Sequence, residues 1–285
     1  MSRFFEKLQD QLSDYLYQLT TNIIEKPLKK VVLIGAGNVA WHMAPALEEQ
    51  GFSIEKVYSR SVENAEKLCE QLYDAVPIAS LDFRESEAQL FIIAVSDTAI
   101  EKIARQLQLP SQDTIVVHTS GAMGTESLKE VEGAYGVLYP LQTFSKSKKV
   151  DFKKIPICID ASTQEALDQV AEVAYALSKQ VYHLSSEERR KLHVAAVLSC
   201  NFTNHFLRLA KGIMEVNGMH FEMLEPLIRE TIDKAFTIGP ENAQTGPAVR
   251  GDVETMNKHL LELSGDEKIQ DLYKLISENI MEMKN

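Results

Sequence analysis

Residues 29–51 read KKVVLIGAGNVAWHMAPALEEQG, and they carry the strongest structural signal in the chain. The β-branched run KVVLI predicts a strand, and the segment that starts with NVAWHM predicts a helix that ends at a glycine. Between them, Gly35, Gly37 and Ala40 form the pattern GxGxxA. In this pattern the first glycine permits a tight turn, the second lets a pyrophosphate approach the backbone, and the small third residue lets the helix pack closely on the strand. The stretch therefore predicts a dinucleotide-binding turn at a helix N-terminus, with a purely structural glycine turn as the alternative.

Strand and helix patterns alternate after this turn. Helical patterns cover residues 38–51, 62–72 and 98–108, and strand patterns cover residues 29–35, 54–60, 89–95, 114–120, 135–140, 156–160 and 181–184. Such alternation is typical of a parallel, doubly wound sheet. From residue 185 onward the pattern is helical. We therefore expect an α/β fold, in which a Rossmann domain with a mainly parallel sheet (28–184) precedes an all-helical domain (185–285).

The first 27 residues carry apolar side chains at helical spacing, among them Phe5, Leu8, Leu12 and Leu16, and this spacing predicts an amphipathic helix. Acidic residues occur throughout the segment and it has no continuous apolar core, so a signal peptide is not expected. Packing on the Rossmann domain or on a second subunit is favoured over a membrane-surface role, because the polar face is not rich in Lys or Arg.

Composition excludes several classes of function. The chain has 285 residues and a net charge of -11, so nucleic acid is not an expected partner. No apolar run is long enough to span a membrane. The three cysteines, Cys69, Cys158 and Cys200, are far apart and form no CxxC pair, so neither a metal site nor a disulfide framework is expected. Cys158 and Cys200 are expected to be buried. Reduced thiols fit a cytoplasmic protein.

The end of the second strand indicates which dinucleotide would bind. An NAD site usually has an acidic residue there to accept hydrogen bonds from the ribose. This chain has Ser59, Arg60 and Ser61 instead, and a guanidinium between two hydroxyls suits a 2′-phosphate. Glu55 is the competing ribose acceptor by spacing, but it lies at the start of the strand. The sequence therefore predicts NADP(H) in preference to NAD.

Two further strand ends lie at the same edge of the predicted sheet. Residues 94–97 (AVSD) follow one strand and are expected near the ribose and nicotinamide, although Asp97 is better explained as a helix cap than as a chemical group. His118 and Ser120 end the next strand, with a structural turn as the alternative, and residues 139–144 are expected in the cleft wall. The predicted cofactor-binding residues are Gly35, Ala36, Gly37, Asn38, Val39, Ala40, Ser59, Arg60, Ser61, Ala94, Val95, Ser96, Asp97, His118 and Ser120.

Candidate catalytic residues occur in the helical half. At about 100° per residue, His193, Asn201 and Asn204 share a polar face amid apolar neighbours, which suits a proton donor aimed at a carbonyl or imine. Polar groups buried between helices are the alternative, and Lys191 is a rival acid. In the turn at 245–252, Arg250 is expected to face the cleft or to pair with Asp252, which would cap the next helix.

Six separated motifs, GAGNVA, AVSD, VVHTSG, YPLQTFS, KLHVAAVLSCNF and TGPAVRGD, occur in order along the chain. Together they resemble a bacterial family that joins a Rossmann-like domain to a C-terminal domain of unknown function and whose members are labelled NADP oxidoreductases. The chain is more distantly similar to pyrroline-5-carboxylate reductase, ketopantoate reductase and deazaflavin-dependent NADP reductases. The resemblance implies NADPH at Gly35, Gly37 and residues 59–61, and a homodimer formed through the helical domains. It implies no particular substrate.

These observations lead to one main hypothesis. The chain is expected to be an NADP(H)-dependent oxidoreductase that transfers a hydride between NADPH and a small carbonyl or imine substrate. His193 would be the general acid, and Asn201 and Arg250 would orient the substrate. Reduction of a deazaflavin or flavin is a second enzymatic alternative. A third alternative is a regulatory or interaction protein that binds NADP(H) without turnover.

Overall fold

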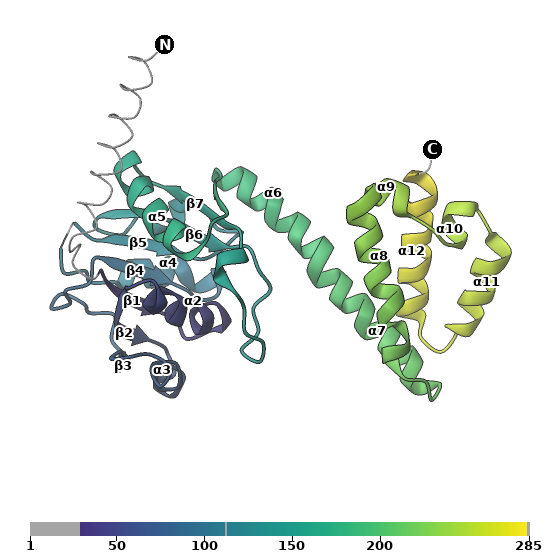
Figure 1. Cartoon of the computed structure of the whole chain (residues 1–285), viewed down its shortest axis with the longest axis horizontal. Coiled ribbons are helices and arrows are strands. Elements are labelled where there is room, and N and C mark those ends of the chain that lie inside the picture. The colour runs from purple at the N-terminus through teal and green to yellow at the C-terminus, as the bar shows by residue number, and fades with distance from the viewer. Residues whose placement is uncertain (1–28, 112, 284–285) are drawn as a thin grey trace, which may run out of the picture. The chain divides into compact units, whose positions relative to one another are not determined.

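The structure is a computed structural model that describes residues 29–111 and 113–283 (Figure 1). The amphipathic helix predicted over residues 1–27 lies outside the described residues. The chain separates into two compact units, one ending at Ala196 and the other starting at Val197. Each unit is described by itself.

An eight-stranded sheet forms the centre of the first unit (Figure 1). Its strands are β1 (Lys30–Ile34), β2 (Ser53–Tyr58), β3 (Val76–Ile78), β4 (Leu90–Ile93), β5 (Ile115–His118), β6 (Ala134–Pro140), β7 (Ile157–Ala161) and β8 (Val181–His183), in the spatial order β3-β2-β1-β4-β5-β6-β7-β8. Neighbouring strands are parallel except for β6 and β7, which are antiparallel. The predicted α/β class and the mainly parallel Rossmann sheet are confirmed.

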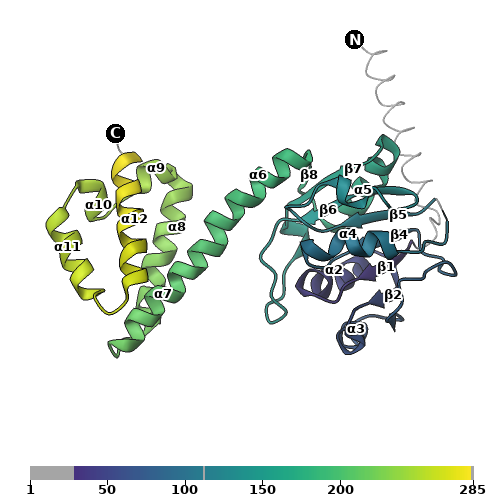
Figure 2. The same cartoon turned by 180° about the vertical axis from the view of Figure 1, so that it is seen from behind.

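Helices cover both faces of the sheet. On one face lie α2 (Asn38–Glu49), α3 (Val62–Cys69) and α5 (Gln164–Leu177), of which α2 and α5 are in front in Figure 1. The opposite face is covered by α4 (Asp97–Gln106), which is in front in Figure 2. Two 3-10 turns, η1 (Thr125–Leu128) and η2 (Phe152–Lys154), connect strands. The apolar residues of β1 alternate between the two buried clusters, so both faces of this central strand are in the core.

Two elements of this unit were not predicted. The three-residue strand β3 contains Pro77 and pairs only with β2, at the edge of the sheet. A proline cannot donate to a strand ladder, so it suits an edge position. Helix α5 begins after Thr163, whose hydroxyl accepts a hydrogen bond from the Ala166 amide. Its buried residues recur at helical spacing.

Helix α6 (Ser186–Ala196) belongs to the first unit. The second unit contains a π-helical turn η3 (Val197–Phe202), α7 (Thr203–Val216), a 3-10 turn η4 (Phe221–Leu224), α8 (Glu225–Ile238), α9 (Pro240–Ala243), α10 (Pro247–Arg250), α11 (Val253–Glu262) and α12 (Glu267–Met283). The helical C-terminal region is confirmed, although the π turn interrupts the one long helix expected after residue 185. Among the described helices, none is long and apolar enough to cross a membrane.

Candidate functional site

The first glycine of the GxGxxA pattern is fixed by the fold. Gly35 follows β1 with φ of 118°, a conformation that side-chain-bearing residues rarely adopt. Its amide donates a hydrogen bond to the Tyr58 carbonyl at 2.7 Å. A Cβ atom added at Gly35 would lie 2.2 Å from the carbonyl oxygen of Ala94. The close approach of the ends of β1, β2 and β4 therefore requires glycine at this position.

The second glycine of the pattern is not required by the chain's own packing. A Cβ added at Gly37 would meet only the Ala94 carbonyl oxygen, at 3.9 Å. Gly37 is the N-cap of α2, and no side chain of the described residues caps this helix. The first N–H groups of α2 are therefore left for a partner, and a helix N-terminus favours an anion. Open space beside Gly37 and uncapped amides together fit a bound phosphate group.

A cleft of about 620 Å³ extends from this turn along the carboxyl ends of the strands. This size is within the range of small-molecule sites. Thirteen of the residues predicted from the sequence line it: Gly35, Ala36, Gly37, Asn38, Val39, Ser59, Arg60, Ala94, Val95, Ser96, Asp97, Ser120 and His193. Tyr139, expected in the cleft wall, also lines it. Thr119 and Gly121, from the strand end at residues 118–121 that was expected at the ligand edge, line it as well. Six further lining residues were not predicted: Tyr58, Asn64, Ala99, Lys102, Ile103 and Gln106.

The end of β2 presents a cation to the cleft. Arg60 is exposed and forms no ion pair with any described acid. Glu55, the competing ribose acceptor, does not line the cleft. Its carboxylate accepts hydrogen bonds from the Ser86 hydroxyl at 3.0 Å and the Glu87 amide at 3.2 Å, and it pairs with Lys56 at 2.9 Å. The structure thus holds the acid away from the edge at which Arg60 lies.

Asp97 does not cap α4, contrary to the expectation. The helix begins at Asp97 itself and its N-cap is Ser96, with no capping hydrogen bond from a described side chain. The Asp97 carboxylate is therefore in the first turn, where the helix dipole favours a negative charge, and it lines the cleft.

Three predicted cofactor residues do not line the cleft. Ala40 is fully buried between α2 and the sheet, and Ser61 is the N-cap of α3. His118 is also fully buried. Its Nδ1 accepts a hydrogen bond from the Ser120 amide at 3.1 Å, and its Nε2 lies 3.2 Å from the Gly124 carbonyl oxygen. Burial lowers the pKa of His118 to about 4. A neutral His118 therefore holds the loop after β5 from inside.

At one end of the cleft, two rings meet beside a glycine. The Tyr139 hydroxyl and Nδ1 of His193 are 3.1 Å apart, and both side chains line the cleft. A Cβ added at Gly121 would lie 2.6 Å from Cζ of Tyr139 and 2.7 Å from Nδ1 of His193. The ring pair therefore depends on glycine at position 121. The three residues come from the loop after β5, from β6 and from α6, so no local sequence pattern indicates this contact.

A buried arginine anchors the helix that carries His193. Arg189 is fully buried and lies one turn before His193. Its guanidinium donates to the Met123 carbonyl at 2.8 Å, the Asp160 carboxylate at 3.4 Å and the Leu184 carbonyl at 3.3 Å.

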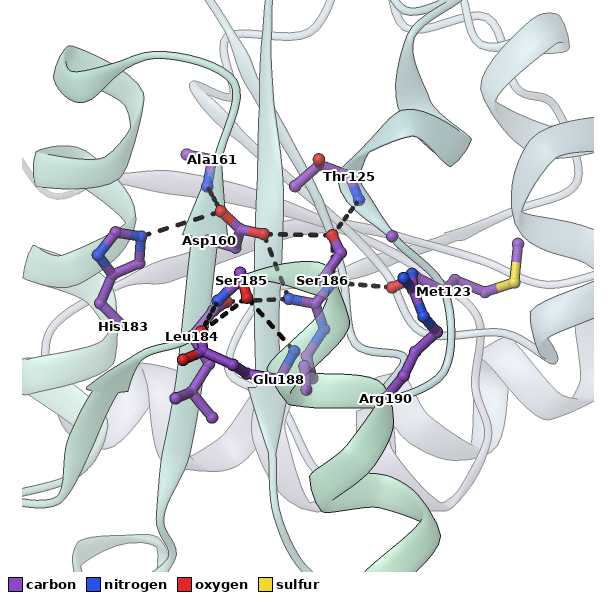
Figure 3. Close-up of polar contacts among 12 residues, drawn as sticks. Met123, Thr125, Asp160, Ala161, His183, Leu184, Ser185, Ser186, Glu188 and Arg190 are labelled. Carbon is purple, nitrogen blue, oxygen red and sulfur yellow. Dashed lines mark hydrogen bonds and ion pairs between the residues drawn. The ribbon is translucent and has the colours of Figure 1, made fainter.

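Figure 3 shows Met123, Asp160 and Ser186 converging from the loop after β5, from β7 and from α6. The Ser186 hydroxyl lies 3.3 Å from the Asp160 carboxylate and accepts a hydrogen bond from the Thr125 amide at 3.4 Å. Burial lowers the pKa of Arg189, and Asp160 opposes this shift. The network fixes the start of α6, and with it His193, relative to the sheet.

The other two predicted catalytic residues belong to the second unit. Asn201 is in the π turn and Arg250 ends α10. The prediction that His193, Asn201 and Asn204 share one face assumes a rotation of 100° per residue. This rotation does not hold across a π turn. Asp252 caps α11 as predicted, since its side chain accepts from the Thr255 amide at 3.0 Å.

Of the two cysteines that were expected to be buried, one is buried and one is exposed. Cys158 is buried as predicted, but Cys200 is exposed, because it lies in the π turn of a unit that buries few side chains. No group of His, Cys, Asp or Glu side chains in the described part of the chain is arranged to hold a metal ion.

The fold and the cleft define the class, a Rossmann-like domain joined to a helical domain. Residues 18–141 match the family described as a Rossmann-like domain, and residues 155–280 match a domain of unknown function, DUF2520. The solved structure of "putative NADP oxidoreductase BF3122" from Bacteroides fragilis is 39% identical, covers 90% of this chain and 98% of its own, and superposes with a TM-score of 0.82. The chain therefore belongs to the same family as this Bacteroides fragilis protein.

Two other solved structures show the same fold. Protein TM1727 from Thermotoga maritima is 23% identical, with a TM-score of 0.71 over 89% of this chain and 99% of its own. An imine reductase from Pseudomonas sp. is 16% identical, with a TM-score of 0.62 over 88% of this chain and 93% of its own. No curated protein matches the chain.

Proposed function

We propose that the chain is an NADP(H)-dependent oxidoreductase that transfers a hydride between NADPH and a small carbonyl or imine compound. The name of the Bacteroides fragilis relative supports the cofactor and the reaction class. The observation that carries the proposal is a single cleft that joins a phosphate-compatible turn at Gly37 to a proton-donating pair, Tyr139 and His193.

The residues along the cleft suit the parts of the cofactor in order. The amides after Gly37 would hold the pyrophosphate, and Arg60 with the neighbouring Ser59 would hold the 2′-phosphate. Ser96 and Ser120 would lie toward the ribose and nicotinamide. When bound, NADPH supplies the hydride.

His193 would supply the proton. Histidine commonly serves as a general acid near neutral pH. The Tyr139 hydroxyl engages Nδ1, which leaves Nε2 to donate to the substrate oxygen or nitrogen that gains the negative charge. Polar groups at this end of the cleft favour a small polar substrate over a deazaflavin or flavin, which would need an apolar slot. Asn201 and Arg250 belong to the second unit, and their role in orienting the substrate stays a prediction.

We further propose that the second unit forms a homodimer with another copy. Its buried apolar residues are only Ala248 and Met256 among those described, whereas Phe236 is 91% and Leu261 72% exposed. A helical unit with so little core needs a partner to cover its apolar faces. Light scattering at several concentrations tests this, and a monomer at all of them would contradict it. The cytoplasmic location stays a prediction.

The experiment for the reaction compares two neighbouring residues of α6. A panel of small carbonyl and imine compounds is screened with NADPH, and then His193→Ala is compared with Lys191→Ala on the compound that turns over fastest. We expect His193→Ala to lower turnover by about 100-fold or more at unchanged NADPH affinity. Lys191 is the matched control, because it is exposed, pairs with Glu187 at 2.6 Å and does not line the cleft. Equal turnover by His193→Ala and wild type would remove His193 from this role, and no turnover on any compound would count against the reductase.

A further inference from the structure

One wall of the cleft is a stripe on helix α4. Ala99, Lys102, Ile103 and Gln106 all line the cleft and follow the i, i+3, i+4, i+7 spacing of one helix face. Arg60 and Asn64 line it from the end of β2 and from α3. Because α3 and α4 pack on opposite faces of the sheet, these residues approach the cleft from two sides.

Two cations of this cleft form no ion pair with a described acid. Arg60 and Lys102 are the only Lys or Arg side chains among the described residues that line the cleft. Lys102 is exposed and pairs with no described acid. Its helix neighbour Arg105 instead forms an ion pair with Glu101 at 3.6 Å and does not line the cleft. Asp97 is the one acidic residue among the described residues that line the cleft, and it pairs with neither cation. In a chain with a net charge of -11, two unpaired cations on one cleft favour an anionic ligand.

A 2′-phosphate has more charge than Arg60 can neutralise. A phosphate monoester carries about -1.5 to -2 charges at neutral pH, so one guanidinium leaves an excess of negative charge. We propose that Lys102 is a second cation for the 2′-phosphate of the cofactor and a determinant of NADPH over NADH. This assignment rests on the proposed NADP(H) function and adds a residue from the helix opposite Arg60.

The test uses two fragments that differ only in the 2′-phosphate. Adenosine 2′,5′-bisphosphate and 5′-AMP are titrated calorimetrically into the full chain, into Lys102→Ala and into the matched control Arg105→Ala. We expect Lys102→Ala to weaken binding of the bisphosphate about tenfold and binding of 5′-AMP less than about twofold. Lys102→Arg should keep most of the preference, and Arg105→Ala should keep all of it. Since Lys102 is exposed, the melting temperature of Lys102→Ala should equal that of wild type.

The titrations distinguish failure of the Lys102 role from failure of the proposed NADP(H) preference. If Lys102→Ala binds both fragments as wild type does, or weakens both equally, Lys102 does not recognise the 2′-phosphate and the inference is wrong. If wild type itself does not distinguish the bisphosphate from 5′-AMP, the proposed preference for NADP(H) is wrong as well. Loss of the preference in Lys102→Ala alone supports the inference.

Discussion

The two compact units differ in how far each buries its own apolar side chains. In the first unit both faces of the sheet are covered, and the cleft is built entirely from its own strand ends and helices. In the second unit the described helices leave Phe236 and Leu261 mostly exposed. The cleft residues all belong to the first unit, whereas the second unit leaves large apolar side chains exposed, and this contrast is the basis of the proposed nucleotide site and of the proposed dimer.

The largest loss of stability is expected at Gly35, where the backbone of the first unit is most constrained. Gly35→Ala would place a methyl group against the Ala94 carbonyl at positive φ, which should cost about 3 kcal/mol or more of unfolding free energy. Gly37→Ala is the matched variant, because its Cβ meets no close atom. It should cost about 1 kcal/mol or less, yet weaken NADPH at least about tenfold. Urea unfolding and NADPH titration of both variants measure this contrast; equal stability losses would contradict it.

The anchor of α6 should give the next largest effect. Arg189→Met leaves the Asp160 carboxylate and two backbone carbonyls without their donor, and we expect a loss of about 3 kcal/mol in unfolding free energy. Arg190→Met is the control, since Arg190 is half-exposed and lies 4.0 Å from Glu126. It should change stability by about 0.5 kcal/mol or less. Comparable losses in the two variants, measured by urea unfolding, would mean that the buried network does not hold the helix.

His118 should make the first unit sensitive to acid. The folded chain lowers the pKa of His118 from 6.5 to about 4, so the folded state binds fewer protons than the unfolded state between these values. Stability is therefore lost as pH falls from about 6.5 to about 4, by up to about 3 kcal/mol from this group. His118→Asn should flatten this part of the stability curve, whatever its cost at pH 7. The unfolding free energy of both proteins is measured by urea unfolding across this pH range. An equal dependence on pH in variant and wild type would show that His118 is not the group responsible.

The smallest effect on a single folded protomer is expected in the second unit. Phe236 is 91% exposed, so Phe236→Ser should change the stability of an isolated protomer by about 0.5 kcal/mol or less. If another copy covers this face, the melting temperature of wild type should rise with protein concentration, and Phe236→Ser should reduce that dependence. A wild-type melting temperature that is independent of concentration would argue against the dimer.

The parts of the fold that were predictable are those in which local sequence determines the structure. The GxGxxA turn, its flanking strand and helix, and the strand ends at Arg60 and Ser96 follow from residue spacing alone. Helix α5 was not predicted, although its sequence carries two local signals: Thr163 caps it and its apolar residues recur at helical spacing. Strand β3 was not predictable, since three residues that include Pro77 carry no periodicity.

The site was less predictable where its geometry is tertiary. Tyr139 and His193 are separated by 54 residues, and the role of Gly121 appears only when both rings are placed beside it. Lys102 is an exposed helix lysine without a local signature. The π turn also gave no signal in the apolar pattern, and it altered the spacing on which the pairing of His193 with Asn201 was based.

The preference for NADP(H) is measured by calorimetric titration of wild type and Arg60→Ala with NADPH and NADH at one salt concentration. We expect wild type to bind NADPH at least about tenfold more tightly than NADH, and Arg60→Ala to lose most of this difference while still binding NADH. Equal affinities for the two dinucleotides in wild type, or no binding of either, would contradict the proposed NADP(H) site at Gly37 and Arg60.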